Sequence, residues 1–130
     1  MLKTTFIEQG TGVCFVGTGV VTAEDLCRAT LALSKSKEVA RRITFGFVDF
    51  EAVTRLQLDT ADLRRLVEID LQLAALVPDA VVAIAAPKDH MYGLARMWEV
   101  LAEETGWKTG VFRSSREACL WVIQNGVYQH

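Results

Sequence analysis

The sequence lacks the features that mark several large classes of protein. Nowhere in its 130 residues does a run approach the ~20 apolar residues that a membrane-spanning helix needs. The opening residues, Met1 to Thr5, lack the apolar core of a signal peptide, and no linker, internal repeat or low-complexity segment follows. We therefore expect one domain over residues 1–130, with a hydrophobic core of its own, in the cytoplasm and without a membrane partner.

An excess of charge of one sign is also lacking, since the net charge is −2. The one notable basic run is interrupted by Glu38 and consists of Lys35, Lys37, Arg41 and Arg42. We interpret this run as the solvated end of a helix, and we expect no nucleic-acid partner.

Cysteine is scarce and scattered, with no Cys-x-x-Cys motif. Each of the three cysteines falls in a predicted strand or helix, on or near an apolar face: Cys14, Cys27 and Cys119. Because thiols stay reduced in the cytoplasm, we predict small buried hydrophobic side chains here and not metal or redox ligands.

The residue combinations of common catalytic sites are missing as well. His90 is the only internal histidine, and it has no Asp–Ser or Cys partner at a recognisable spacing. Gly17-Thr18-Gly19 is too short for a phosphate-binding loop, and no cluster of metal-ligand residues is present. We therefore expect no enzymatic activity, no cofactor and no bound metal.

The chain begins with a predicted hairpin. Residues at 4–8 and 13–21 are rich in β-branched and aromatic types, and Gly10-Thr11-Gly12 separates them. Thr22 then caps a helix, with Asp25 three residues later as its capping-box partner.

Strands and helices alternate along the remaining sequence. A nearly all-apolar strand is predicted at 43–50, a second buried strand at 80–86 and a last strand at 107–112. A helix follows each of them, over 60–77, 87–105 and 118–124. Gly106 lies where the second of these helices is expected to stop. The order β-β-α-β-α-β-α-β-α predicts an α/β fold: a mixed, mostly parallel five-stranded sheet with four helices and an antiparallel first hairpin.

The segment from Val48 to Leu63 is the most informative one. It is predicted to be the end of a buried strand, a short crossing loop and a helix that opens on Asp59 and Thr60. These two residues then lie at the carboxyl edge of a strand, where α/β sheets place ligands and switches. Two interpretations stay open. In the first, Thr60 caps the helix, or Asp59 does so in its place. In the second, Thr60 is a phospho-acceptor or a ligand group.

The element order and several local strings resemble the SpoIIAA-like proteins of the STAS family, which is named for sulfate transporters and anti-sigma-factor antagonists. The resemblance runs from about Phe6 to Val122. In regulatory STAS domains a helix begins Asp-Ser-Ser-Gly-Leu, and a partner kinase phosphorylates one of the serines. Asp59-Thr60-Ala61-Asp62-Leu63 lies where that string would fall: it keeps the Asp and the Leu, and Thr60 stands for the first Ser.

Later strings look like the uncharacterised SpoIIAA-like branch, which is also described as STAS/SEC14-like. They are Tyr92 to Glu99, Val111 to Arg113 and Glu117 to Val122. The resemblance implies a STAS-like fold and a regulatory protein that a phosphorylation at Thr60 would switch.

Asp70 occupies an unusual position on the predicted helix over 60–77. Apolar residues form an arc of roughly 220° on that helix, and Asp70 projects near its middle. A lone carboxylate there is costly unless it is bonded or paired. Asp70 therefore meets a polar group at the helix–sheet seam, lies in a symmetric dimer contact, or faces a ligand pocket. The arc exceeds the ~100° that one sheet face needs, so its excess lies under neighbouring helices or against a second subunit.

Polar residues also open the predicted helix over 87–105. Tyr92 and Arg96 are four residues apart and share a face. Arg96 either pairs with Glu99 on the helix surface or forms, with its neighbours, an anion or carbonyl clamp beside the Asp59–Thr60 edge. Trp98 and Trp121 fall on core-facing stripes and are predicted to serve in packing.

The sequence predicts a non-enzymatic regulatory or protein-interaction module that is a homodimer and binds a protein partner whose identity the residues do not reveal. The alternative is a carrier in which the helices over 60–77 and 87–105 enclose a cavity for a small apolar, lipid-like ligand. The candidate site residues are Asp59, Thr60, Asp70, His90, Tyr92 and Arg96.

Overall fold

The computed structural model describes residues 1–127, and its first two strands form the expected hairpin. β1 (Leu2–Ile7) and β2 (Gly12–Thr22) run antiparallel, from the pair Leu2 and Gly17 to the pair Ile7 and Gly12. The short 3-10 turn η1 (Glu8–Gly10) joins them. β1 is an edge strand, and it is exposed over most of its length.

The other strands extend this hairpin into one mixed sheet. They are β3 (Phe45–Gln57), β4 (Val81–Ala85) and β5 (Lys108–Phe112). The strand order is β1-β2-β3-β4-β5, and every pair after the hairpin is parallel. The predicted α/β fold with a mostly parallel five-stranded sheet is therefore confirmed.

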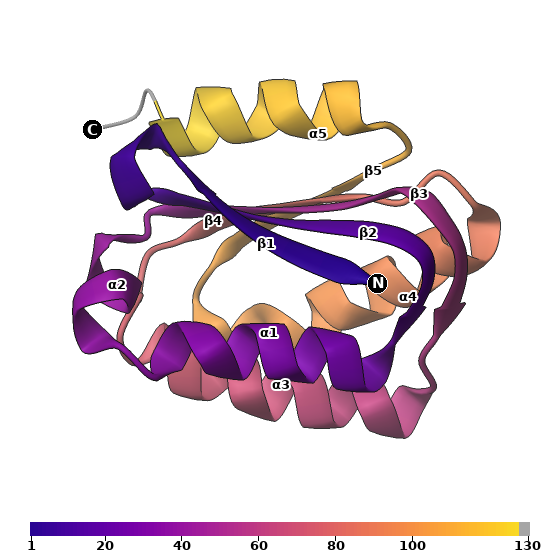
Figure 1. Cartoon of the computed structure of the whole chain (residues 1–130), viewed down its shortest axis with the longest axis horizontal. Coiled ribbons are helices and arrows are strands. Elements are labelled where there is room, and N and C mark those ends of the chain that lie inside the picture. The colour runs from indigo at the N-terminus through magenta and orange to yellow at the C-terminus, as the bar shows by residue number, and fades with distance from the viewer. Residues whose placement is uncertain (128–130) are drawn as a thin grey trace.

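Helices cover the two faces of the sheet unequally. The structure has α1 (Ala23–Ser34), α2 (Lys37–Arg42), α3 (Thr60–Ala74), α4 (Asp89–Leu101) and α5 (Ser115–Val122). α1, α3 and α4 lie on one face, and α5 lies on the other (Figure 1). The 3-10 turn η2 (Ala102–Thr105) continues α4, and Gly106, with φ at 78°, ends it as expected. A π-helical turn, η3 (Ile123–Val127), continues α5.

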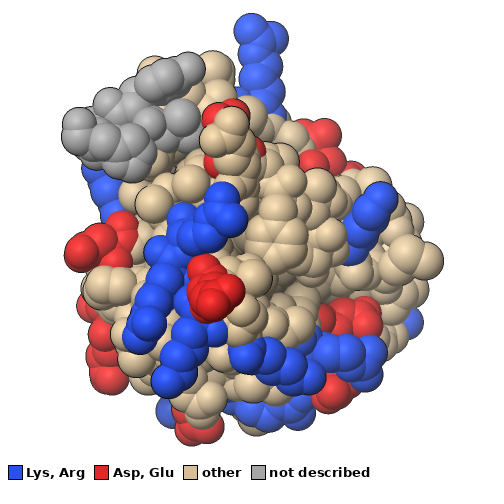
Figure 2. Space-filling model, turned by 60° about the vertical axis from the view of Figure 1, so that its left-hand side comes forward, with Lys and Arg blue, Asp and Glu red and all other residues tan. Residues whose placement is uncertain are grey.

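The short helix α2 is an element that the sequence pattern did not predict. The Ser36 hydroxyl caps it by accepting a hydrogen bond from the backbone N–H of Val39. Arg41 and Arg42 lie in its last turn, so the basic run does belong to a solvated helix end. Figure 2 shows acidic side chains interspersed among the basic ones on the side of the molecule that bears α2.

β3 differs most from expectation. It was predicted to end near Phe50 in a loop, but it runs for 13 residues to Gln57. Its second half pairs with β2 from Thr18–Ala52 to Thr22–Gln57, after a register shift that adds a residue to β3. The polar residues of this half are exposed, whereas Val53 and Leu56 are buried in the core. The alternation typical of a strand was hidden by the bulges, which interrupt its period.

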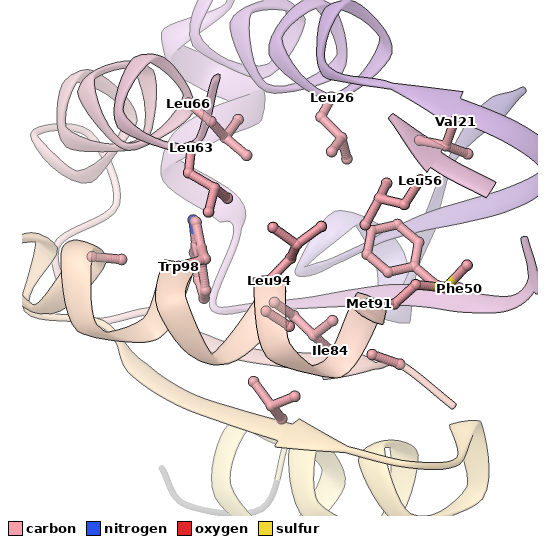
Figure 3. Packing of buried hydrophobic residues seen from close by; sticks show 14 of the residues in the cluster. Val21, Leu26, Phe50, Leu56, Leu63, Leu66, Ile84, Met91, Leu94 and Trp98 are labelled. Atoms are coloured by element: carbon pink, nitrogen blue, oxygen red, sulfur yellow. The ribbon is translucent and has the colours of Figure 1, made fainter. Parts of the chain in front are cut away.

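The main hydrophobic core lies between the sheet and the three-helix layer. Figure 3 shows Leu63 and Leu66 of α3 converging with Leu94 and Trp98 of α4 on Leu26 of α1. α3 thus packs against α1 on one side and against α4 on the other. The wide apolar arc of α3 is covered by neighbouring helices of the same chain, so its width does not require a second subunit.

The core on the opposite face is smaller and combines Phe45 with several small residues. Ala83 and Ala85 of β4 lie under Ala118 and Val122 of α5. Trp121 packs beside them, 5.5 Å from the ring of Phe112 between centroids. Small side chains let α5 approach the sheet closely.

The cysteines differ in burial. Cys27 is buried in the main core and Cys14 is half-buried, but Cys119 is exposed. The expectation of burial was wrong for Cys119, because the buried face of α5 is formed by Ala118 and Val122. Burial raises the pKa of the Cys27 thiol, which keeps it protonated and unreactive.

Candidate functional site

An open cleft lies at the carboxyl edge of the sheet, where the sequence placed the candidate site. Its volume is about 700 Å³. The end of β3, the start of α3 and the start of α4 line it: Thr54, Arg55, Leu56, Gln57, Leu58, Asp59, Asp62, Lys88, His90 and Met91. The Lys88 ammonium donates a hydrogen bond of 3.3 Å to the carbonyl oxygen of Thr54, which ties α4 to β3 across the cleft. Cations and carboxylates thus meet at one edge, as expected for adjacent parallel strands.

Asp59, and not Thr60, caps α3. An Asp59 side-chain oxygen accepts a hydrogen bond of 2.8 Å from the N–H of Asp62. In return, Asp62 accepts one of 3.0 Å from the N–H of Asp59, which completes a capping box. Of the two capping residues that the sequence suggested, Asp59 is confirmed and Thr60 was wrong, and the spacing Asp59-x-x-Asp62 was the signal that distinguishes them.

Thr60 is instead the first residue of α3 and is exposed. Within residues 1–127 its hydroxyl forms no hydrogen bond to protein. The hydroxyl is therefore accessible to a modifying enzyme or a partner. Whether it is a phospho-acceptor or ligand group stays a prediction.

The structure separates the other candidates on α4. His90 is exposed and lines the cleft, but neither Tyr92 nor Arg96 does. Arg96 forms the predicted surface pair with Glu99, 3.2 Å between nitrogen and oxygen. The Tyr92 ring lies 4.1 Å from the guanidinium carbon of Arg113, in a cation–π contact. Roles of these residues in binding a ligand or a second subunit stay predictions.

A polar group that the sequence analysis missed ties α5 to β3. The Ser115 hydroxyl donates to Asp49 over 2.8 Å, and the Ser115 N–H donates to Glu51 over 2.7 Å. Two carboxylates two residues apart on one strand share a face, and that spacing was the signal in an otherwise apolar segment. They occupy the positive end of α5, so these acids have a structural partner inside the chain.

Asp70 lies in the core, as its place in the apolar arc predicts. Its exposed fraction is 6%, and one oxygen accepts a hydrogen bond of 2.8 Å from the indole N–H of Trp98. The polar partner lies at the seam between α3 and α4, and not at the helix–sheet seam that the sequence suggested. Burial raises the pKa of Asp70 to about 7, although the Trp98 hydrogen bond acts in the opposite direction.

An apolar cavity of about 110 Å³ adjoins Asp70, between the sheet and the layer of α1, α3 and α4. Its wall includes Phe15, Leu66, Leu94 and Trp107. Asp70 is the charged residue of this wall, and the other lining residues are almost all apolar. The chain thus has two concave regions, one charged and open and the other apolar and more enclosed, and Leu56 and Leu58 border both.

The described residues also set limits on other kinds of site. Among residues 1–127, no three His, Cys, Asp or Glu side chains are grouped so that they could hold a metal ion. None of the helices in that range is both long and apolar enough to cross a membrane.

The strand order, the antiparallel hairpin and the helix that starts at the Asp59 edge define a mixed α/β fold. No family model and no curated protein matches the sequence. Several solved structures match this chain, and two of them cover almost all of it. One is the anti-sigma factor antagonist SpoIIAA in its unphosphorylated form, with a TM-score of 0.61, 10% identity and coverage of 95% of this chain and 98% of that chain.

The other is an uncharacterised protein of the DUF3478 family from Shewanella loihica PV-4, which has a SpoIIAA-like fold. Its TM-score is 0.56 and its identity 17%, over 93% of this chain and 91% of that chain. The present chain therefore has a SpoIIAA-like fold, which confirms the resemblance seen in the sequence. At these identities the likeness concerns the fold and not the activity.

Proposed function

We propose that this chain is a non-enzymatic regulatory module of the cytoplasm, a single domain that binds a partner protein at the carboxyl edge of its sheet. The observation that carries the proposal is the exposed Thr60 at the start of α3, beside the cleft. The similar anti-sigma factor antagonist is described in an unphosphorylated form. In our proposal, Thr60 is the residue of this chain that is phosphorylated. The free cysteines of the described chain suit a reducing compartment.

The charges around Thr60 suggest the direction of the switch. A phosphate adds about −1.5 to −2 charge at neutral pH. The capping box engages the N–H groups of Asp59 and Asp62, and the carboxylates of these two residues would repel that phosphate. Lys88 and His90 lie across the cleft. In our proposal phosphorylation therefore disturbs the first turn of α3, changes the charge of the cleft and weakens partner binding.

A glutamate at position 60 tests this proposal. We expect Thr60→Glu to lose a bound protein that the unmodified chain retains when it is isolated from its native cells. The matched control is Thr4→Glu, which places the same charge at an exposed threonine of β1. A set of bound proteins that is the same for Thr60→Glu and Thr4→Glu would contradict the edge as the docking site.

The proposed homodimer uses the exposed face of α4. Met97 is 42% exposed and Val100 is 66% exposed, and residues three apart lie on the same side of a helix. An isologous contact between two such faces would bury both side chains. Light scattering at about 100 μM should report a dimer that Val100→Glu converts to a monomer. Leu120→Glu on α5, where the side chain is 53% exposed, is the matched control.

The internal cavity favours a second function, that of a carrier for a small apolar, lipid-like ligand. The cavity lies between the sheet and α3 and α4, the helices that the sequence suggested as its walls. Its lining is apolar except at Asp70 and Thr30. Native mass spectrometry of the purified protein would report a ligand that stays bound through purification. A protein that is always free of ligand counts against the carrier and leaves the partner-binding proposal standing.

A further inference from the structure

The wall of this cavity offers one ionisable group, Asp70, with unused hydrogen-bonding capacity. Thr30 donates its hydroxyl to the Leu26 carbonyl, 2.9 Å away, and Trp107 donates its indole N–H to the Val77 carbonyl, 2.7 Å away. Both donors are engaged by the chain itself. A carboxyl group accepts several hydrogen bonds, but within residues 1–127 Asp70 receives one, from Trp98.

Packing alone does not explain a carboxyl group at position 70, because an apolar side chain would pack there as well. Replacing a buried charged group by an apolar one of similar size is often neutral or stabilising. The surrounding wall already consists of leucine, valine and aromatic side chains, which would pack well against another leucine. A buried titratable group with a strongly shifted pKa that borders a cavity is a candidate binding group.

We propose that this cavity is a binding site for a small apolar molecule with a single uncharged hydroxyl group, an alcohol or a phenol, whose hydroxyl bonds to Asp70. The inference rests on the carrier function proposed above and is independent of partner binding at Thr60. It names the chemical class of the ligand and the residue that recognises it.

The choice of a hydroxyl group on the ligand follows from the protonation state of Asp70. With a pKa of about 7, the carboxyl group is present in both protonation states near neutral pH. A hydroxyl can donate to the carboxylate and can also accept from the carboxylic acid. An ammonium group can only donate, and it would bring a second charge into an apolar wall that has no further partner for it. An uncharged hydroxyl therefore suits this wall better than an amine.

The size of the cavity limits the size of the ligand. An engineered apolar cavity of about 150 Å³ admits benzene. The cavity beside Asp70 measures about 110 Å³, so it suits a molecule of about one ring or a short chain. Phenol, benzene and benzylamine are therefore matched probes that share a ring and differ in the polar group.

The test is an NMR titration of the full chain with these three probes at neutral pH. We expect phenol to shift the Trp98 indole N–H signal, which reports directly on the Asp70 hydrogen bond. We expect phenol to bind about tenfold or more tightly than benzene, as one hydrogen bond to a charged group would produce. Trp98→Phe assigns the signal and should keep the preference for phenol, because Asp70 remains.

Two variants separate the roles of the carboxyl group and the cavity. Asp70→Ala should bind benzene and phenol with similar affinity. Ala95→Leu, which extends a wall residue into the cavity, should abolish binding of both. Benzene binding without a preference for phenol would overturn the role of Asp70 and leave the carrier function standing. Tighter binding of benzylamine than of phenol would overturn the proposal that the ligand is uncharged. If none of the three probes binds, both the proposed binding site and the carrier function are overturned.

Discussion

Two aspartates eleven residues apart on the same helix, Asp59 and Asp70, have opposite surroundings. Asp59 is exposed at the open cleft and exchanges hydrogen bonds with its own helix start. Asp70 is buried beside the internal cavity, and its partner comes from another helix. The comparison shows that burial, and not residue type, decides whether a carboxylate serves as a cap or becomes a group with a raised pKa.

The largest expected effect is the pH dependence at Asp70. Well below pH 4, the group is protonated in the folded and the unfolded chain. As the pH rises from about 4 to about 7, the unfolded carboxyl loses its proton while the folded one keeps it, so the free energy of unfolding falls by up to about 4 kcal/mol. Asp70→Asn removes this dependence.

Denaturant unfolding of both proteins from about pH 4 to about pH 8 measures that difference. The wild type should lose stability relative to Asp70→Asn as the pH rises, because other titrating groups cancel in the comparison. A difference that does not change with pH would show that Asp70 is as well solvated as Asp59.

The next effect compares the packing beside Asp70 with the packing on the other face of the sheet. Ala83 is fully buried under α5, so Ala83→Leu should overpack that face and cost ~1–3 kcal/mol. Ala95 borders the cavity, so Ala95→Leu should cost less than ~1 kcal/mol, because free space accepts the added atoms. Thermal unfolding of the two variants measures both losses of stability. Equal losses would mean that side chains fill the space beside Ala95 and leave no free cavity there.

A smaller effect is expected at the exposed aspartate. Asp59→Ala removes the cap of α3 and should cost ~1 kcal/mol of stability. Asp59→Ser supplies another capping oxygen and should recover most of the loss. Urea unfolding at neutral pH measures both. If Asp59→Ala unfolds at the same urea concentration as the wild type, the capping box does not stabilise α3 in solution.

The smallest effect is expected at Thr60. Because its hydroxyl is exposed and without a protein hydrogen bond among the described residues, Thr60→Ala should change stability by less than ~0.5 kcal/mol. The same unfolding experiment as for Asp59 gives a direct comparison of neighbours. A loss of ~1 kcal/mol at Thr60 would restore the interpretation of this residue as the cap.

Much of the fold was predictable from local patterns. The alternation of apolar strands with amphipathic helices predicted the order of the elements, and the apolar arc of α3 predicted the burial of Asp70. Gly106 marked the end of α4 and its 3-10 turn. These features depend on residues a few positions apart, which is the range that sequence periodicity reports.

The candidate site was predicted less completely. Asp59 and His90 do line one cleft, but Thr60, Tyr92 and Arg96 are not part of its lining. The second half of β3, after Phe50, was predicted as a loop, because its bulges break the period of two. The contacts of Ser115 with Asp49 and Glu51 escaped notice, since they join residues more than sixty positions apart.

The sequence by itself determined the class of fold, the edge at which charged residues gather and the face of α3 on which Asp70 lies. Tertiary structure decided which groups meet there: Trp98 bonds to Asp70 from 28 residues away, and α1, α3 and α4 leave a cavity beside them. The physical reason is that periodicity orients each side chain relative to its own helix or strand. The packing of those elements against one another decides what that side chain contacts and how far its charge is removed from water.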